Sequence, residues 1–174
     1  MSSNKSFIVS VVMPVYNAAP FVEEAVNSAL KQPEVGEILL IEDGSPDNAI
    51  EICRRLVLTD KRIRLFQHAE GKNLGAGESR NVGLRNATYP YIAFLDADDI
   101  FGDDRFKKDK ELFENDETID GVYNAVAPLL DSDYAIHVTQ SRFKLKDASM
   151  KIRKPYRNGT PFEFQRDENL AITS

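Results

Sequence analysis

The feature that most constrains this chain is a regular alternation of apolar runs with segments of helical character. Four runs rich in β-branched and other apolar side chains predict strands, most of them buried on both faces: residues 7–13, 37–41, 63–68 and 91–95. Four segments between and after them predict helices: 19–32, 47–59, 75–87 and 103–114. This order predicts an α/β fold with a mostly parallel, doubly wound sheet and helices on both faces. We expect the first strand to end before Pro14.

The length of 174 residues fits a single domain, 1–174, that buries a core without staples. Segments 121–127 and 135–139 predict two further strands after the alternating part. The one cysteine, Cys53, excludes an internal disulfide, and with only two histidines a Cys/His zinc site lacks ligands. We therefore expect any metal to be held by oxygen. No apolar run approaches the ~18 residues of a membrane span, so we expect a soluble, cytoplasmic protein.

Charge is unevenly distributed along the chain. The net charge of −6 argues against a nucleic-acid partner, because phosphate affinity comes from clustered Lys and Arg. Residues 96–120 are rich in acids, whereas the segment from Arg142 to Arg157 is rich in bases. Such runs are usually solvated faces. The basic segment can alternatively attract a lipid-linked phosphate or the inner face of a membrane, or fold over bound phosphates.

Polar residues follow three of the predicted strands. They are Pro14-Val15-Tyr16-Asn17, Glu42-Asp43-Gly44-Ser45-Pro46-Asp47 and Asp96-Ala97-Asp98-Asp99. Because ligands of open α/β sheets bind outside the carboxyl ends of the strands, we expect these residues to share one rim.

Asp96 and Asp98 are the most informative pair on this rim. Carboxylates at i and i+2 can both turn toward one Mg²⁺ or Mn²⁺, whose remaining ligands are water and substrate phosphates. The pair therefore indicates a diphosphate ligand. The plain alternative is an acidic turn in which Asp98 or Asp99 caps a helix.

Asp43 and Arg80 each have two interpretations. Asp43-Gly44-Ser45 is a tight turn with Gly44 at positive φ and Ser45 or Asp47 capping the next helix, but Asp43 can also accept the imide N–H of uracil. Arg80 is either a solvated helix arginine or a ligand for base or phosphates.

Two common phosphate-binding motifs are excluded. Gly75-Ala76-Gly77 continues to Arg80 where a dinucleotide fingerprint needs a third glycine, and it follows the third strand. Gly71-Lys72 is preceded by Phe66 at the position of the first P-loop glycine and followed by Asn73.

The strand-end motifs in this order resemble family 2 glycosyltransferases of the GT-A fold. The motifs are Pro14-Val15-Tyr16-Asn17, Glu42 to Asp47, Asn73-x-Gly75 with Arg80-Asn81-x-Gly83, and Phe94 to Asp99. The resemblance covers residues 7–101, which would form the donor-binding half, with 102–174 as part of the acceptor side. It implies a nucleotide-diphospho-sugar transferase fold and inverting transfer of a sugar from a nucleoside diphosphate, most often UDP, to a saccharide or lipid-linked acceptor with Mn²⁺ or Mg²⁺.

The resemblance also implies roles for individual residues. Asp43 would bind the base, while Pro14, Tyr16 and Arg80 would line the nucleoside pocket together with Asn17. Asp96 would face the ribose or the metal, and Asp98 would coordinate the metal.

The catalytic base of such an enzyme has only weak candidates in this chain. Asp167 and Glu168 resemble the family's downstream acidic pair, and Asp131 and Asp133 are weaker still. We expect the base to lie in a longer native chain. The alternative function is a nucleotide-sugar binding module without catalysis; a nucleotidyltransferase would need a glycine-rich basic loop after the first strand, which residues 16–20 do not form.

Overall fold

The computed structural model describes residues 6–124 of the chain. Residues 6–117 belong to one compact unit, which contains every helix and strand of the described part. Residues 118–124 belong to a second unit, most of which lies outside the described residues. The single domain over 1–174, with halves 1–101 and 102–174, therefore stays a prediction.

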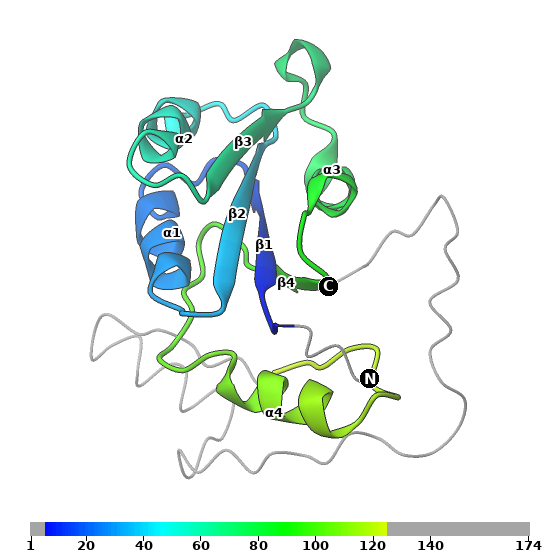
Figure 1. Ribbon diagram of the computed structural model, residues 1–174. Helices are drawn as coiled ribbons and strands as arrows, with labels where there is room; N and C mark the ends of the chain where they lie inside the picture. Colours follow the sequence, from blue (N-terminus) through cyan, green and yellow to red (C-terminus); the bar gives the residue numbers. More distant parts are fainter. Residues whose placement is uncertain (1–5, 125–174) are drawn as a thin grey trace, which may run out of the picture. The chain divides into compact units, whose positions relative to one another are not determined.

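Four parallel strands form one sheet in the order β3-β2-β1-β4 (Figure 1). They are β1 (Val9–Val15), β2 (Val35–Glu42), β3 (Ile63–Gln67) and β4 (Tyr91–Phe94). The chain adds β2 and β3 on one side of β1 and then returns to add β4 on the other. This order confirms the predicted parallel, doubly wound α/β fold. The strand order reverses between β1 and β4, which is where sheets of this kind bind ligands.

Helices cover both faces of the sheet, as expected. Figure 1 shows α1 (Val22–Leu30) and α2 (Ala49–Val57) on one face and α3 (Gly75–Asn86) on the other. Alternate residues of β1 serve the two layers: Met13 packs in the core that includes α1 and α2, whereas Val12 packs in a cluster with Val82 of α3. Helix α3 packs closely against β1, because a Cβ on Gly83 would lie 2.2 Å from Val12 Cγ1.

The prediction that the first strand ends before Pro14 is wrong, because β1 continues to Val15. The Leu95 N–H donates to the Val12 carbonyl (3.1 Å), so the backbone of Val12 faces β4. Pro14 is two residues further along and faces the same side, where β4 has already ended at Phe94. Its missing N–H therefore falls where the pairing of β1 with β4 has ended.

Three predicted helices begin later than expected, α2 by two residues and α1 and α4 by three or four. The N–H groups of Phe21 and Val22 both donate to the Ala18 carbonyl, so residues 18–21 form a turn before α1. The last helix of the described part, α4 (Lys107–Asn115), begins after Asp104, whose φ of 53° is not helical. A short 3₁₀ turn, η1 (Ala69–Gly71), precedes α3. Residues 121–124 form no strand; the rest of segment 121–127 and all of 135–139 lie outside the described residues.

Candidate functional site

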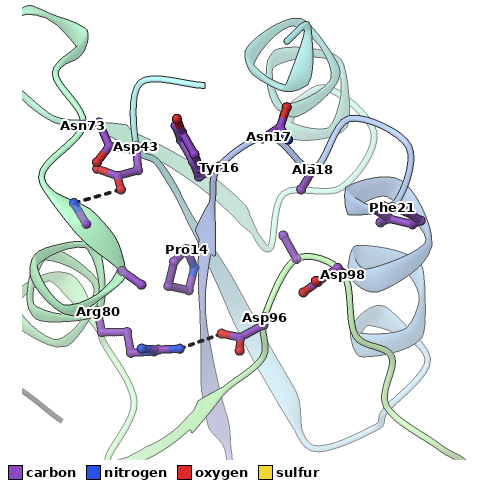
Figure 2. A pocket seen from close by; sticks show the side chains of 13 residues that line it. Pro14, Tyr16, Asn17, Ala18, Phe21, Asp43, Asn73, Arg80, Asp96 and Asp98 are labelled. Atoms are coloured by element: carbon purple, nitrogen blue, oxygen red, sulfur yellow. Dashed lines mark hydrogen bonds and ion pairs between the residues drawn. The ribbon is translucent and has the colours of Figure 1, made fainter. Parts of the chain in front are cut away.

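A pocket of about 540 Å³ opens at the carboxyl ends of β1, β2 and β4 (Figure 2). Its size is within the usual range of small-molecule sites. It is lined by Pro14, Tyr16, Asn17, Ala18, Phe21, Asp43, Asn73, Gly75, Ala76, Arg80, Asp96, Ala97 and Asp98. Every residue predicted to bind nucleotide or metal is among them, so the structure brings the predicted rim together. Their individual roles remain predictions.

Asp43 forms the buried back wall of the pocket and is only 2% exposed. Its carboxylate accepts the N–H groups of Leu74 (2.7 Å) and Gly75 (3.0 Å), at the beginning of α3. His68 Nε2 lies 3.3 Å from Asp43 Oδ1 and 2.9 Å from the hydroxyl oxygen of Ser79 on α3. Because α3 has no side-chain cap of its own, Asp43 caps this helix from a different strand end.

The loops after β1 and β2 are joined by hydrogen bonds. The Asn17 N–H, in a residue with a φ of 52°, donates to Ser45 Oγ (3.3 Å). Asp47 accepts the N–H groups of Ala19 (2.8 Å) and Ala49 (3.1 Å), and so caps α2 while holding the turn before α1. The turn interpretation of this motif is therefore correct, and Asp43 can still read a base because each carboxylate oxygen has a second lone pair.

Gly44 is required by the turn between Asp43 and Ser45. Its φ is +68°, and a Cβ there would lie 2.6 Å from the Gly71 carbonyl oxygen. We expect Gly44→Ala to lower the free energy of unfolding in urea by about 1–3 kcal/mol, because backbone cannot yield as a flexible side chain can. Gly77→Ala is the matched control: no atom lies within 4 Å of its Cβ position, so this helix substitution should be neutral or stabilising by about 0.5–1 kcal/mol. Equal losses in both variants would contradict the explanation.

Arg80 and Asp96 form an ion pair across the lower part of the pocket in Figure 2. The Arg80 guanidinium donates to Asp96 Oδ1 at 2.7 Å. Only 17% of the Arg80 side chain is exposed, so the interpretation of Arg80 as a solvated helix arginine is wrong. The pair fixes the guanidinium above the sheet edge between β1 and β4.

Beyond this pair the pocket becomes strongly acidic. Asp98 and Asp99 are both exposed, and Asp98 lines the pocket. Partial burial, followed by the negative charges of Asp98 and Asp96, raises the pKa of the Asp99 carboxyl. This excess of negative oxygen ligands fits a hard divalent cation such as Mg²⁺ or Mn²⁺. Within residues 6–124 no three acidic, His or Cys side chains converge as a complete metal site. The pocket therefore fits a cation that takes some of its ligands from the protein and the others from a diphosphate.

Of the lining residues that the sequence did not predict for the site, Phe21 has the largest side chain. Phe21 repeats with Ala25 and Ala29 along the apolar side of α1, and this periodicity predicts a core residue. It is instead 49% exposed and lines the pocket. Periodicity alone does not reveal this, because Phe21 lies in the turn before the helix.

Several predicted residues lie outside the described part of the chain. They are the base candidates Asp131, Asp133, Asp167 and Glu168 and the basic segment from Arg142 to Arg157. Among the helices that the structure describes, none is long and apolar enough to cross a membrane.

A family model described as glycosyl transferase family 2 matches residues 10–168. An uncharacterized glycosyltransferase of Haemophilus influenzae is 40% identical over 102 residues, which are 58% of this chain and 40% of that protein. The glycosyltransferase GlyG of Streptococcus pneumoniae is 42% identical over 55% of this chain and 31% of its own length.

Solved structures give a consistent result. Staphylococcus aureus TarS 1-349 in complex with UDP-GlcNAc has a TM-score of 0.56 and 25% identity, covering 70% of this chain and 37% of TarS. The mannosyltransferase PcManGT from Pyrobaculum calidifontis, in complex with GDP-Man and Mn²⁺, has a TM-score of 0.50 over 57% of this chain and 30% of that one. The chain thus spans less than half the length of each of these relatives.

Proposed function

Because the chain belongs to glycosyl transferase family 2, we propose that it binds a nucleoside-diphosphate sugar and transfers the sugar to a hydroxyl acceptor. The observation that carries the proposal is the pocket where carboxylates and Arg80 meet at the reversal of strand order. The finer proposal is an inverting, metal-assisted transfer from a UDP-sugar to a saccharide or lipid-linked hydroxyl. The TarS complex with UDP-GlcNAc supports a UDP-linked donor.

The end of the pocket at Asp43 is suited to a base. The Tyr16 ring is half exposed beside it, which leaves a π-face for stacking. Asp43 is held rigidly by two N–H donors, and a carboxylate can accept the single imide N–H of uracil. Guanine presents two neighbouring N–H groups and would need both Asp43 oxygens at once. Because Oδ1 already accepts the Leu74 N–H and lies 3.3 Å from His68 Nε2, we infer that the base is uracil.

The opposite end of the pocket is suited to ribose and diphosphate. Arg80 and Asp96 lie between the base end and Asp98, and the guanidinium can bind phosphate oxygens in its fork geometry. Asp98, with Asp96, would hold the divalent cation, which when bound supplies positive charge to the departing diphosphate.

The proposed reaction needs a base from elsewhere in the protein. The acceptor oxygen attacks the anomeric carbon from the face opposite the diphosphate, the bond from that carbon to the diphosphate oxygen breaks, and the hydroxyl proton passes to a carboxylate. Asp167 and Glu168 are the candidates for that carboxylate within this sequence. Pre-arranged charge around the diphosphate lowers the barrier, because negative charge grows there in the transition state.

Calorimetric titration of UDP and GDP into the chain, with and without Mn²⁺, tests the proposal. We expect UDP to bind more tightly than GDP and Mn²⁺ to raise the affinity for UDP. Failure of both nucleotides to bind under all conditions would overturn the proposal, and a preference for GDP would correct the donor. Acceptor-dependent release of UDP from a UDP-sugar then separates a transferase from a module that only binds.

A further inference from the structure

Two polar side chains are buried in α1 and just after its end. Ser28, in α1, is 7% exposed, and Gln32, two residues after the helix ends at Leu30, is 3% exposed. A buried amide costs free energy unless its N–H and C=O groups are hydrogen-bonded. The hydrogen-bond partners of Ser28 and Gln32 therefore explain why these polar side chains can be buried.

Both side chains bind one distant segment, residues 101–105. Ser28 Oγ accepts the Phe101 N–H (3.0 Å). Gln32 donates from Nε2 to the Gly102 carbonyl (3.0 Å) and accepts the Arg105 N–H at Oε1 (3.0 Å). These three hydrogen bonds, which we call the α1 tie, join parts of the chain that are 70 to 73 residues apart in the sequence.

The segment held by the α1 tie directly continues the acidic loop of the pocket, residues 96–99. The loop is anchored on its other side by β4, where the Leu95 N–H bonds to Val12, and Ala97 within it is buried. Only Ile100 separates the loop from Phe101. The loop is therefore a short span with both ends fixed to the core.

The loop needs this restraint because of its charge. Asp96, Asp98 and Asp99 carry like charges in a short span, and Arg80 pairs only with Asp96 among them. Repulsion favours an open loop, which would move Asp98 away from the pocket. The turn that leads into the same helix carries Phe21, which lines the pocket as Asp98 does (Figure 2).

We propose that Ser28 and Gln32 are positioning residues that hold the acidic loop against α1 and so set the place of Asp98 for a cation bound with diphosphate. The inference rests on the proposed function for its final clause. The restraint itself is a property of the metal-free chain, and this allows the two to be tested separately.

The restraint is tested first without nucleotide or metal, by hydrogen exchange of the full 174-residue chain. The reporter is the Asp99 N–H, which bonds to the Asp96 carbonyl (3.0 Å) and touches neither variant side chain. In Gln32→Met and in Ser28→Ala the exchange rate of this amide should rise roughly tenfold, as expected for the loss of buried hydrogen bonds. Val26→Ala is the control: it removes buried methyl groups from the same helix and leaves the α1 tie intact.

The positioning role is tested by the gain in UDP affinity that Mn²⁺ produces. We expect Gln32→Met and Ser28→Ala to reduce this gain roughly tenfold while UDP affinity without metal is unchanged. Val26→Ala should keep the full gain. A full gain in both tie variants, or an equal loss in all three variants, overturns the inference.

Failure of the proposed function gives a different pattern. If the unmodified chain shows no Mn²⁺-dependent UDP binding, the proposed function and the link to the cation both fall. If Asp99 exchange is also unchanged by Gln32→Met, the restraint falls independently.

Discussion

Asp98→Asn is expected to abolish the increase in UDP affinity caused by Mn²⁺ and to reduce sugar transfer by roughly 10²–10³-fold, as removal of one pre-arranged charge-stabilising group typically does. Asp98 is exposed at the acidic end of the pocket, and among the described residues no Lys or Arg side chain forms an ion pair with it. Asparagine has nearly the same shape but is a much weaker ligand for a hard divalent cation. Calorimetry and a UDP-release assay measure the two effects.

Asp103→Asn is the matched control for this prediction. It makes the same change of charge a few residues further along, at an exposed position that does not line the pocket. Its UDP affinity and Mn²⁺ dependence should stay close to those of the unmodified chain. If the two variants behave alike, the effect is one of overall charge, and Asp98 is not a metal ligand.

The part of the site that could be predicted from sequence depends on strand ends. Strand patterns are local, and in a parallel sheet all carboxyl ends lie at one edge, so polar residues after the strands must converge there. Asp43, Asp96 and Asp98 needed no further information to be placed on one rim. The family resemblance added their proposed roles.

Long-range contacts explain what the sequence did not reveal. Nothing near Asp43 in the sequence indicates that it caps α3, since Leu74 and Gly75 come about thirty residues later. The hydrogen-bond partners of Gln32 likewise lie far away in the sequence, in residues 101–105. Pro14 predicts a strand end because proline has no N–H to donate. Whether that missing N–H matters depends on where the neighbouring β4 ends, which the sequence around Pro14 does not indicate.

A second polar cluster lies on the α3 side of the sheet, around Glu37 of β2. The carboxylate accepts the Ser10 hydroxyl (2.7 Å), the Thr88 N–H (2.5 Å) and the Arg64 guanidinium (2.7 Å), and only 6% of the side chain is exposed. Ser10 is the register partner of Glu37 on β1. The cluster thus joins β1, β2 and β3 to the segment that leads from α3 to β4.

Glu37→Ala is expected to lower the free energy of unfolding in urea by about 3 kcal/mol, the lower end of the cost of breaking a buried ion pair. The lower end applies because the Arg64 side chain is 40% exposed and regains water, whereas the Ser10 hydroxyl stays buried without its partner. Glu51→Ala is the control, since Glu51 pairs with Arg54 at the surface and should contribute less than about 1 kcal/mol. Similar losses in both variants would contradict a special role for the buried cluster.

The same carboxylate gives the stability a predictable dependence on pH. Burial by itself raises the pKa of Glu37, but hydrogen bonds from Ser10, Thr88 and Arg64 outweigh it and hold the pKa below the ordinary 4.5. Between the lowered pKa of the folded state and the ordinary pKa of the unfolded state, the unfolded chain binds more protons than the folded chain, so stability rises with pH. The contribution is complete above pH 4.5 and is lost as the pH falls through the lower, folded-state pKa.

Glu37→Gln isolates this contribution, because glutamine keeps the size of the side chain but does not titrate. We expect the free energy of unfolding of Glu37→Gln, measured in urea at a series of pH values below 4.5, to fall less steeply with acid than that of the unmodified chain. Above pH 4.5 the two curves should run parallel, separated by the loss of the charged hydrogen bonds. Identical slopes below pH 4.5 would mean that other carboxyls carry the acid sensitivity, and that the cluster around Glu37 stabilises the fold without linking it to pH.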